Sequence, residues 1–474
     1  MLRTLASDSW DTVVIGSGPN GLTAAVTIAG AGYRVLVLEA AGEIGGGTRT
    51  LALTLPGFLH DICSAIHPLA VSSPALLAMP LGLHGLEWIQ PAAPLAHPLD
   101  GGRSVALDRS LATTATSLGG DGGAYHRLFS PAVRNWELLT GNLRIPRDPI
   151  GLLRFGRSSA RPASRLLETF RGTPARALVA GAAAHSNLTL EASFTSGFAL
   201  SLMAAGHAVG WPFPRRGAGS IAAALASYLD SFGGTIETGV RVNSLDELPP
   251  HRMVLCDVSP RELLRISGAR FPAWYRRRLD EYAYGPAAFK VDWALDAPIP
   301  WADPGCCRAA TLHLGGTAEE IAASERAVWA GGCPERPFVI AAQHTLFDPS
   351  RAPEGKHTAW AYCHVPNGST ADMTARIEQQ LERFAPGFRD RILARSTLGP
   401  ADLEAHNPNL VGGDFCCGAN LWPQLFARPT ILAWYTPDRR VLICSSATPP
   451  GAGVHGLCGY LAARAALRRL RGGL

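Results

Sequence analysis

Residues 12–39 alternate between short apolar runs and a glycine-rich break, a pattern that predicts one complete strand–helix–strand unit. The β-branched run 12–15 is typical of a buried parallel strand, and the small apolar residues 22–31 suit a helix that packs on a sheet. A second apolar run, 33–38, predicts another strand, which ends at Glu39. We therefore expect two neighbouring parallel strands joined by a helix that crosses one face of the sheet.

The break between the first strand and the helix is the motif GSGPNG at 16–21. In a unit of this kind Gly16 makes the tight turn, Gly18 lets the backbone approach a pyrophosphate and Gly21 lets helix and strand pack closely. The helix start favours the anion through its unpaired N–H groups and its dipole, and the acid after the second strand accepts hydrogen bonds from ribose hydroxyls. The residues predicted to hold a dinucleotide are Gly16, Gly18, Asn20, Gly21 and Glu39.

Two further glycine-rich segments favour FAD over a nicotinamide dinucleotide. Gly45 and Gly46 let the chain pass beside an extended dinucleotide, and Thr48 and Arg49 offer donors toward its phosphate or flavin edge. Residues 451–456 form a second G-x-G-x-x-G, but too little chain follows for a complete nicotinamide fold. The start of the following helix would instead stabilise negative charge on a flavin ring. The alternative is a glycine-rich turn into an ordinary amphipathic helix.

Motifs along nearly the whole chain resemble the phytoene desaturase-like flavoproteins, in particular the branch of pyridine nucleotide-disulfide oxidoreductase domain proteins. The matching segments include VVIGSGPNGLTAA at 13–25, PGFLHDICSAIHPLA at 56–70, GHAVGWPFPRRGAGSIAAAL at 206–225, LCDVSPREL at 255–263, GPAAFKVDWAL at 285–295, FDPSRAPEGKH at 347–357, NPNLVGGDF at 407–415 and ICSSATPPGAGVHG at 443–456. The resemblance implies FAD as the cofactor. It also implies that the backbone of Val240 and Val242 contacts the adenine side, and that Gly451, Gly453, Val454 and His455 approach the isoalloxazine ring.

The resemblance further implies an α/β fold in which a discontinuous, glutathione reductase-like Rossmann-type domain binds FAD. The sequence agrees, because a helix is expected over 217–232 and strands over 235–244, 253–257 and 441–444, followed by a helix over 453–470. The expected FAD-binding domain comprises 1–75, 214–280 and 425–474. An inserted α+β substrate-binding domain is expected to comprise 76–213 and 281–424.

The segment 192–214 contains no Asp, Glu, Lys or Arg and is long enough to cross a bilayer. Its serines, threonine, histidine and Gly or Pro breaks argue against a membrane span, as does the absence of a second such segment. We predict a buried helix that lines a cavity. Only 17% of all residues are charged, which is compatible with an apolar substrate site.

One dinucleotide fold without a second nicotinamide site predicts hydride transfer between substrate and flavin N5, with electrons leaving to oxygen, a quinone or another acceptor. We expect a dehydrogenase or desaturase that forms a C=C or C=X bond in an apolar or amphipathic small molecule. One alternative is a flavin-dependent isomerase or saturase without net oxidation. Another is a non-catalytic FAD-bound scaffold that docks to a membrane or a partner.

Three side chains are the candidates for catalysis. His455 comes first because it stands at the helix entry near the predicted flavin. His344 comes second because it ends a strand of the substrate domain that the pattern predicts over 341–344. Asp61, beyond the glycine doublet, is the third. For each of these histidines a purely structural role is the alternative.

Charge and cysteine usage narrow the remaining partners. The net charge of +5, with acids interspersed among arginines, does not indicate nucleic-acid binding. Eight arginines between 144 and 176 predict either a solvated helical face or peripheral contact with anionic lipid headgroups. No metal-ligand spacing occurs, and the ten cysteines are expected to be reduced. The segment 1–10 has no apolar run, so we expect a cytoplasmic protein, with peripheral membrane contact as an alternative.

Overall fold

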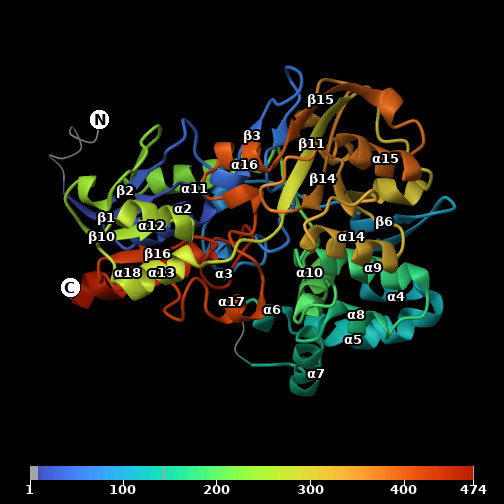
Figure 1. Cartoon of the computed structure of the whole chain (residues 1–474), viewed down its shortest axis with the longest axis horizontal. Helices are drawn as coiled ribbons and strands as arrows, with labels where there is room; N and C mark the ends of the chain where they lie inside the picture. The colour runs from blue at the N-terminus through green and yellow to red at the C-terminus, as the bar shows by residue number, and fades with distance from the viewer. Residues whose placement is uncertain (1–8, 142–144, 473–474) are drawn as a thin grey trace.

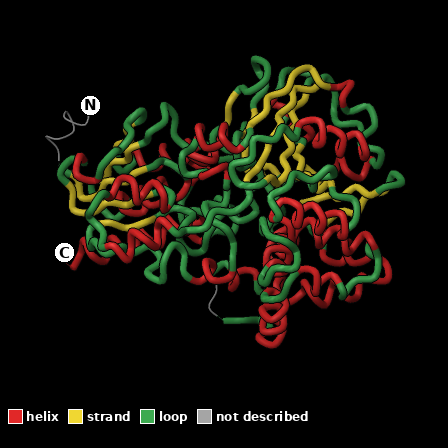
Figure 2. The backbone as a smooth tube through the Cα atoms, in the orientation of Figure 1, coloured by secondary structure: helices red, strands yellow, loops and turns green. Residues whose placement is uncertain are grey.

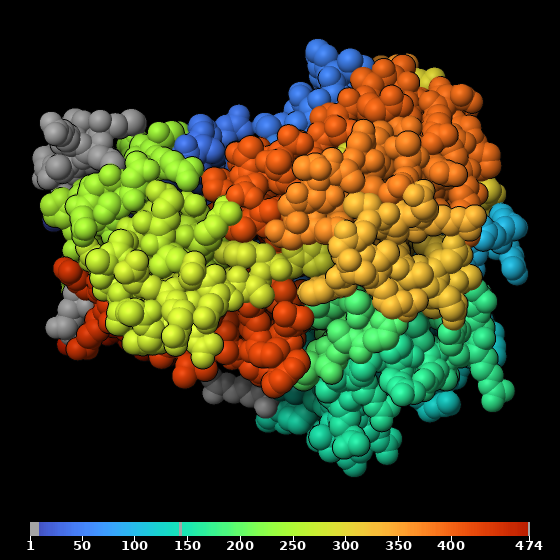
Figure 3. Space-filling view, in the orientation of Figure 1, coloured from blue at the N-terminus to red at the C-terminus, as the bar shows by residue number. Residues whose placement is uncertain are grey.

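The computed structural model describes residues 9–141 and 145–472, so residues 1–8 and Arg144 of the arginine-rich segment lie outside the description. The chain forms two regions, each built on its own sheet (Figure 1 and Figure 2). Both chain ends belong to the same region, as the blue and red ribbons of Figure 1 show. The space-filling view in Figure 3 shows the teal to green segments and the yellow-orange to orange segments together in the other region.

The first region contains a five-stranded parallel sheet assembled from distant parts of the chain. Its strands, in spatial order, are β16 (Val441–Ile443), β10 (His251–Cys256), β1 (Trp10–Ile15), β2 (Val35–Leu38) and β9 (Thr235–Glu237). Val13 faces one core of this sheet and Val14 faces the other, because successive side chains of a strand point to opposite sides. Burial on both faces explains why these strands are continuous apolar runs.

Helices cover both faces of the parallel sheet. The helices of this region are α2 (Pro19–Ala29), α3 (Pro74–Leu77), α11 (Gly219–Asp230), α12 (Pro260–Ser267), α13 (Ala273–Asp280) and α18 (Leu457–Gly472). Side chains of α2, α11 and α18 share one core with Val14 and Leu255, whereas those of α12 and α13 share the opposite core with Val13 and Leu36. This arrangement confirms the predicted Rossmann-type domain.

The second region contains a separate seven-stranded sheet. Its strands, in spatial order, are β15 (Ile392–Leu398), β11 (Ala287–Leu295), β14 (His357–Val365), β13 (Val339–Ala342), β12 (Ala309–Leu314), β6 (Ala93–Leu99) and β7 (Arg103–Leu107). Two small ribbons pair β3 (Thr50–Leu51) with β4 (His60–Asp61) and β5 (Trp88–Ile89) with β8 (Phe213–Pro214). The α/β architecture with a second, mixed sheet is the one expected from the sequence.

A layer of helices covers one face of the second sheet and forms the lower right of Figure 1. These helices are α4 (Leu111–Ser117), α5 (Gly122–Arg134), α6 (Trp136–Leu139), α7 (Pro149–Ser159), α8 (Ala163–Leu167), α9 (Thr173–Ala184), α10 (Thr195–Ala208) and α14 (Ala318–Trp329). Elsewhere lie α15 (Thr374–Phe384), which packs in the core of the opposite face, α16 (Pro400–His406) and α17 (Trp422–Phe426). The charge-free segment 192–214 contributes the largely buried helix α10, as predicted.

Two expected elements differ from the structure. Within 235–244 only β9 pairs with the sheet, and Gly239, with φ +70°, turns the chain away, so Val240 and Val242 lie in an irregular segment. The last helix begins at Leu457 rather than at Gly453, because Gly451, Gly453 and Gly456 all have positive φ and interrupt helical geometry.

Within 9–141 and 145–472, none of the helices combines the length and apolar character needed to cross a bilayer.

Candidate functional site

One cavity of about 870 Å³ extends from the parallel sheet to the second sheet and its helical layer. Its size lies within the range of about 300–1,000 Å³ that is typical of pockets for small molecules and cofactors. The predicted cofactor residues that line it are Gly16, Gly18, Asn20, Glu39, Gly46, Thr48, Arg49, Val240, Val242, Gly453 and Val454. The remaining predicted cofactor residues, Gly21, Gly45, Gly451 and His455, are not part of its wall.

The glycine motif makes the tightest backbone contacts of this site. Gly16 has φ +98°, and a Cβ there would come within 2.8 Å of the carbonyl oxygen of Asp257. A Cβ on Gly21 would lie 2.1 Å from the carbonyl oxygen of Gly16. The loop and the start of α2 therefore meet through backbone alone, which leaves the cavity wall at Gly16 and Gly18 open to a ligand.

Asp257, immediately after β10, is a site residue that the motif analysis did not single out. Its carboxylate oxygen Oδ2 accepts a hydrogen bond from the N–H of Gly21 at 2.8 Å, and its side chain lines the cavity. Burial raises the pKa of this carboxyl to about 7. The segment LCDVSPREL contains it, but only the parallel pairing of β10 with β1 brings it to the glycine loop.

Glu39 stands at the end of β2, on the cavity wall, as the sequence predicts. Its carboxylate oxygen Oε2 accepts hydrogen bonds from the N–H and hydroxyl of Ser17, at 2.9 and 2.6 Å, and Oε1 accepts one from the N–H of Ala41 at 2.8 Å. These bonds hold the carboxylate beside the glycine loop. Each oxygen keeps further lone-pair capacity for ribose hydroxyls.

The Gly45–Gly46 doublet adopts positive φ at both residues and passes directly behind the first loop. A Cβ on Gly46 would come within 3.2 Å of the Cα of Gly18. The hydroxyl of Thr48 donates to the carbonyl of Gly45 at 2.7 Å, and the guanidinium of Arg49 donates to the carbonyl of Gly46 at 3.1 Å. Both predicted donors therefore form hydrogen bonds with the glycine doublet, and both also line the cavity.

Asn20 is largely buried on the cavity wall, and its amide nitrogen donates to the hydroxyl of Ser446 at 3.3 Å. Its side-chain oxygen has no hydrogen-bond partner among the described residues. A buried polar atom normally has a partner. The orphaned oxygen therefore marks a place where a ligand donor fits.

The C-terminal glycine segment reaches the cavity through Gly453 and Val454, whereas His455 is not part of the cavity wall. Its Nδ1 accepts the N–H of Leu457 at 3.0 Å, so the imidazole caps the first turn of α18. Its carbonyl accepts the hydroxyl of Ser73 at 2.5 Å. Burial lowers the pKa of His455 to about 4. The structure therefore places this predicted catalytic residue in a capping role.

Asp61 and His344 lie near each other, but neither lines the cavity. Asp61 accepts hydrogen bonds from the Arg351 guanidinium at 2.6 Å, from the hydroxyl of Thr50 at 2.7 Å and from the N–H of Ala218 at 2.7 Å. Burial alone would raise the pKa of Asp61, but the Arg351 charge and these hydrogen bonds outweigh burial and hold it at about 2.

The contacts of Asp61 and Arg351 join the two regions of the protein. Ala218 immediately precedes α11 of the first region, and Arg351 also donates to the carbonyl of Pro214 at 3.1 Å and to Asp348 at 3.3 Å. His344 packs edge-on against Phe213, with ring centroids 5.0 Å apart, and burial holds its pKa well below the ordinary value. This cluster is a structural clamp behind the cavity.

The substrate-side wall contains polar groups that sequence reasoning did not select. Lys290 on β11 pairs in register with Tyr362 on β14, and both line the cavity. The Lys290 ammonium forms an ion pair with Asp292 and lies 5.6 Å from the ring centroid of Trp360. The sequence signal that could have found Lys290 is its rarity, because Lys290 and Lys356 are the only lysines of the chain.

His185, at the end of α9, also lines the cavity and is only half-buried. Its Nε2 lies 2.9 Å from Nε2 of the fully buried His313 on β12, so one imidazole donates and the other accepts. Burial lowers the pKa of His185 to about 3 and that of His313 well below its ordinary value. Both rings are therefore neutral near pH 7.

Metal and disulfide chemistry find no support in the geometry of the described residues. Within 9–141 and 145–472 no group of three or more His, Cys, Asp or Glu side chains is arranged to hold a metal ion. All ten cysteines are free thiols, and burial raises the pKa of the Cys63 thiol on the cavity wall to about 11.

Comparison with known proteins agrees with this geometry. The family model of the NAD(P)-binding Rossmann-like domain matches residues 14–79. Pyridine nucleotide-disulfide oxidoreductase domain-containing protein 2 of Mus musculus is 26% identical to the chain, over 98% of this chain and 94% of that protein.

Two solved structures share the fold. An oxidoreductase from Methanosarcina mazei superposes with a TM-score of 0.63 and 16% identity, covering 97% of this chain and 100% of that one. Putrescine oxidase bound to putrescine gives a TM-score of 0.61 and 15% identity, covering 98% and 99%. Likeness at this level of identity shows the fold alone.

The match over residues 14–79 is to the NAD(P)-binding Rossmann-like domain, and these residues include the glycine motif of the cavity wall. Along nearly the whole chain the similarity is to pyridine nucleotide-disulfide oxidoreductase domain-containing protein 2. The resemblance inferred from the motifs is thereby confirmed.

We expect Arg351→Met to lower the free energy of unfolding at pH 7 by about 3–5 kcal/mol, because the buried Asp61 carboxylate loses its partner. The pKa of Asp61 lies below its unfolded value, so the pair stabilises fully above about pH 4, and this stabilisation is lost as pH falls through the folded pKa. The difference between variant and parent should therefore shrink in acid. Urea denaturation at several pH values measures it.

Arg336→Met is the matched control, because the Arg336 side chain is 75% exposed. Its expected effect is within about 0.5 kcal/mol at every pH. Equal unfolding free energies for the two variants would contradict the conclusion that the Asp61–Arg351 pair stabilises the fold.

Proposed function

We propose that the protein is an FAD-dependent dehydrogenase that forms a C=C or C=X bond in an apolar or amphipathic small molecule. The single observation that carries this proposal is the continuity of the cavity. One space of about 870 Å³ runs from the glycine motif and Glu39 to a wall that includes Trp211, Ile340 and Trp360. A dinucleotide and a small substrate would meet in it.

The residues present fit FAD. The closely packed backbones of Gly18 and Gly46 form a cradle that a Cβ on either residue would narrow. The orphaned side-chain oxygen of Asn20 and the carboxylate of Glu39 offer acceptors to a ligand with hydroxyl and amide donors. Gly453 and Val454 would lie at the ring end, and Val242 at the adenine end. When bound, FAD supplies the hydride acceptor.

The cavity wall opposite the glycine motif determines which class of substrate can bind beside the cofactor. Phe198, Leu202, Trp211 and Ile340 offer apolar contact, which favours a hydrocarbon portion of the substrate. The Lys290 ammonium and the His185 imidazole are polar groups in the same wall. Together they favour a substrate with one polar end.

Dehydrogenation removes a hydride and a proton from the substrate, so a proton acceptor is needed as well as the cofactor. His185 is the best-placed acceptor, because it is neutral, lines the cavity and is backed by His313 at 2.9 Å. A proton taken up by His185 would be shared with His313 along this contact. The electrons then leave to oxygen, a quinone or another acceptor.

A flavin-dependent isomerase or saturase is the second candidate, and the same cavity would serve it. Product mass separates the two, because dehydrogenation removes two hydrogens whereas isomerisation leaves the mass unchanged and saturation adds two. The non-catalytic scaffold predicts no product at all.

We expect Gly21→Ala to weaken FAD binding by roughly 10- to 100-fold, because the added methyl would force the α2 start away from the Gly16 carbonyl. Flavin absorbance of the purified protein, followed by titration with added FAD, measures the loss. Gly42→Ala is the matched control, since a Cβ there meets nothing within 4 Å. A parent protein that stays colourless after incubation with FAD would overturn the proposed function.

We expect anaerobic bleaching of the bound flavin by the substrate, sought among polyenes and alicyclic intermediates, and slower bleaching in His185→Gln by about 100-fold or more. Dithionite should reduce both proteins equally, because it needs no proton acceptor in the cavity. Because the pKa of His185 is about 3, its protonation should not limit the rate until the pH falls close to that value.

His84→Gln, a surface histidine bonded to Ser227, serves as the control and should bleach at the parent rate. Equal rates in parent and His185→Gln would remove His185 from the mechanism, and bleaching by none of the candidates would count against a dehydrogenase.

A further inference from the structure

Large apolar side chains are exposed on one part of the surface. Among the described residues, eight of the fifteen exposed large hydrophobic side chains belong to two short segments around α7 and α17, namely Leu139, Ile145, Ile150, Leu153, Leu421, Trp422, Phe426 and Ile431. We call these eight residues the apolar rim. Trp422 is 62% exposed, Phe426 69% and Leu153 68%. Isolated exposed apolar residues are ordinary, but such a concentration marks a site of interaction.

The apolar rim adjoins the end of the cavity. The ring of Phe426 packs edge-on against Phe194, with centroids 5.7 Å apart, and the N–H of Phe194 donates to the carbonyl of Ala160, the residue that directly follows α7. Phe194 lines the cavity together with Ser159 of α7 and Leu425 of α17. The cavity wall and the apolar rim are therefore formed by the same elements, which lie along the lower edge of the molecule in Figure 1.

Positive charge accompanies the apolar rim. Arg154 and Arg157 on α7, and Arg161 just beyond it, are exposed and form no ion pair within the described ranges. Neighbouring Arg147 and Arg165 are paired with surface glutamates at 3.3 and 2.9 Å. The unpaired cations fit an anionic surface.

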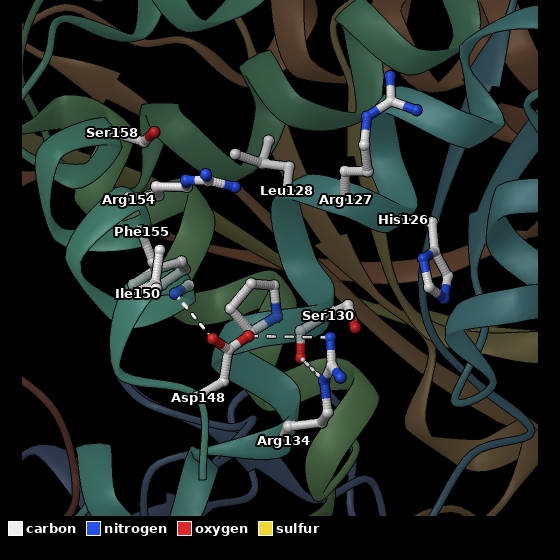
Figure 4. A pocket seen from close by; sticks show the side chains of 12 residues that line it. His126, Arg127, Leu128, Ser130, Arg134, Asp148, Ile150, Arg154, Phe155 and Ser158 are labelled. Carbon is white, nitrogen blue, oxygen red and sulfur yellow. Dashed lines mark hydrogen bonds and ion pairs between the residues drawn. The ribbon is translucent and has the colours of Figure 1, made fainter. Parts of the chain in front are cut away.

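A pocket of about 280 Å³ lies between α5 and α7, next to these arginines. Arg127, Arg134 and Arg154 line it together with Ser130 and Ser158, and Figure 4 shows the Arg127 guanidinium pointing away from Arg134 and Asp148. The Asp148 carboxylate lies 3.9 Å from Arg134 and accepts the N–H of Gly151 at 2.8 Å, so it neutralises only one of the three cations. The pocket is therefore suited to a single anionic headgroup.

We propose that the apolar rim and the arginines of α7 dock the protein onto an anionic lipid bilayer, with the end of the cavity facing the membrane. Trp422 and Phe426 would enter the interface, where aromatic side chains are favoured, while the arginines contact headgroups. A hydrocarbon substrate would then pass from the bilayer to the cavity without crossing water. Docking itself needs no flavin chemistry, whereas the entry of substrate rests on the proposed function.

The test is co-sedimentation of the full-length, flavin-loaded protein with vesicles of phosphatidylcholine alone or of phosphatidylcholine mixed with phosphatidylglycerol. We expect binding to the mixed vesicles that weakens as salt is added, because headgroup charges are screened. Arg154→Gln/Arg157→Gln should bind about 30-fold more weakly, from the usual contribution of two cations at an anionic surface. Trp422→Ser/Phe426→Ser should also bind at least about tenfold more weakly.

Two controls alter exposed residues of α13, which contributes no side chain to the apolar rim or to the cavity wall. Arg276→Gln/Arg278→Gln on α13 matches the charge change, and Trp274→Ser, with Trp274 51% exposed, matches the loss of an aromatic ring. Both should bind like the parent. Equal thermal melting and flavin content across the variants would show intact folding.

Failure of the parent protein to sediment with either kind of vesicle overturns the proposal, even if the flavin remains active. Equal weakening in the rim variants and in the α13 controls overturns it as well, because the apolar rim would then have no special part in binding. Weakening confined to the rim variants supports it, whether or not a substrate has been found.

Discussion

The close backbone contact between the glycine loop and the end of β10 is the constraint on which the rest of the structure depends. The N–H of Gly16 donates to the carbonyl of Leu38 at 2.8 Å, and the N–H of Asp257 donates to the carbonyl of Ile15 at 2.8 Å. Three strand ends are thus joined around one turn, and the start of α2 is drawn onto them. Any side chain at Gly21 would separate these elements.

The second requirement is that two regions face each other across one cavity. The clamp formed by Asp61, Arg351 and Asp348 holds them together at a point behind the cavity wall. Because the clamp is fully buried and its carboxyl is ionised, it fixes the relative position of α11 and the second sheet without occupying the site. The chemistry is thereby left to the groups on the wall.

Aromatic and aliphatic side chains make up much of that wall. Lys290 and His185 stand among them, and the wall also includes the hydroxyls of Ser201 and Thr311 and the amide of Asn420. The Lys290 ammonium is paired with the buried Asp292 carboxylate, so it presents a substrate with a dipole, which acts strongly in a low-dielectric space. The apolar lining of the cavity continues to the surface at α17, where Leu425 lines the cavity and Trp422 and Phe426 are exposed.

The local sequence pattern was sufficient to predict many of the residues that line the cofactor end of the cavity. Three features are recognised from local residue types and spacing: the apolar run before the motif at 16–21, the acid Glu39 and the doublet Gly45–Gly46. They could therefore be predicted without knowing which distant segments they contact. The family resemblance implied the discontinuous α/β domain, and the apolar runs along the chain agreed with it. The exact boundaries of the two domains remain a prediction.

The tertiary structure decided which candidate catalytic side chains reach the cavity. His455 and Asp61 stand beside conspicuous motifs, yet the first caps α18 and the second pairs with Arg351, which is 290 residues away in the chain. Conversely, His185 meets His313 only because α9 packs on the second sheet, and Asp257 meets Gly21 only because β10 pairs with β1. The sequence by itself determined where a dinucleotide can be held, since that depends on backbone freedom and local spacing. Which side chains face the cavity depends on contacts between distant segments, and only the folded chain contains that information.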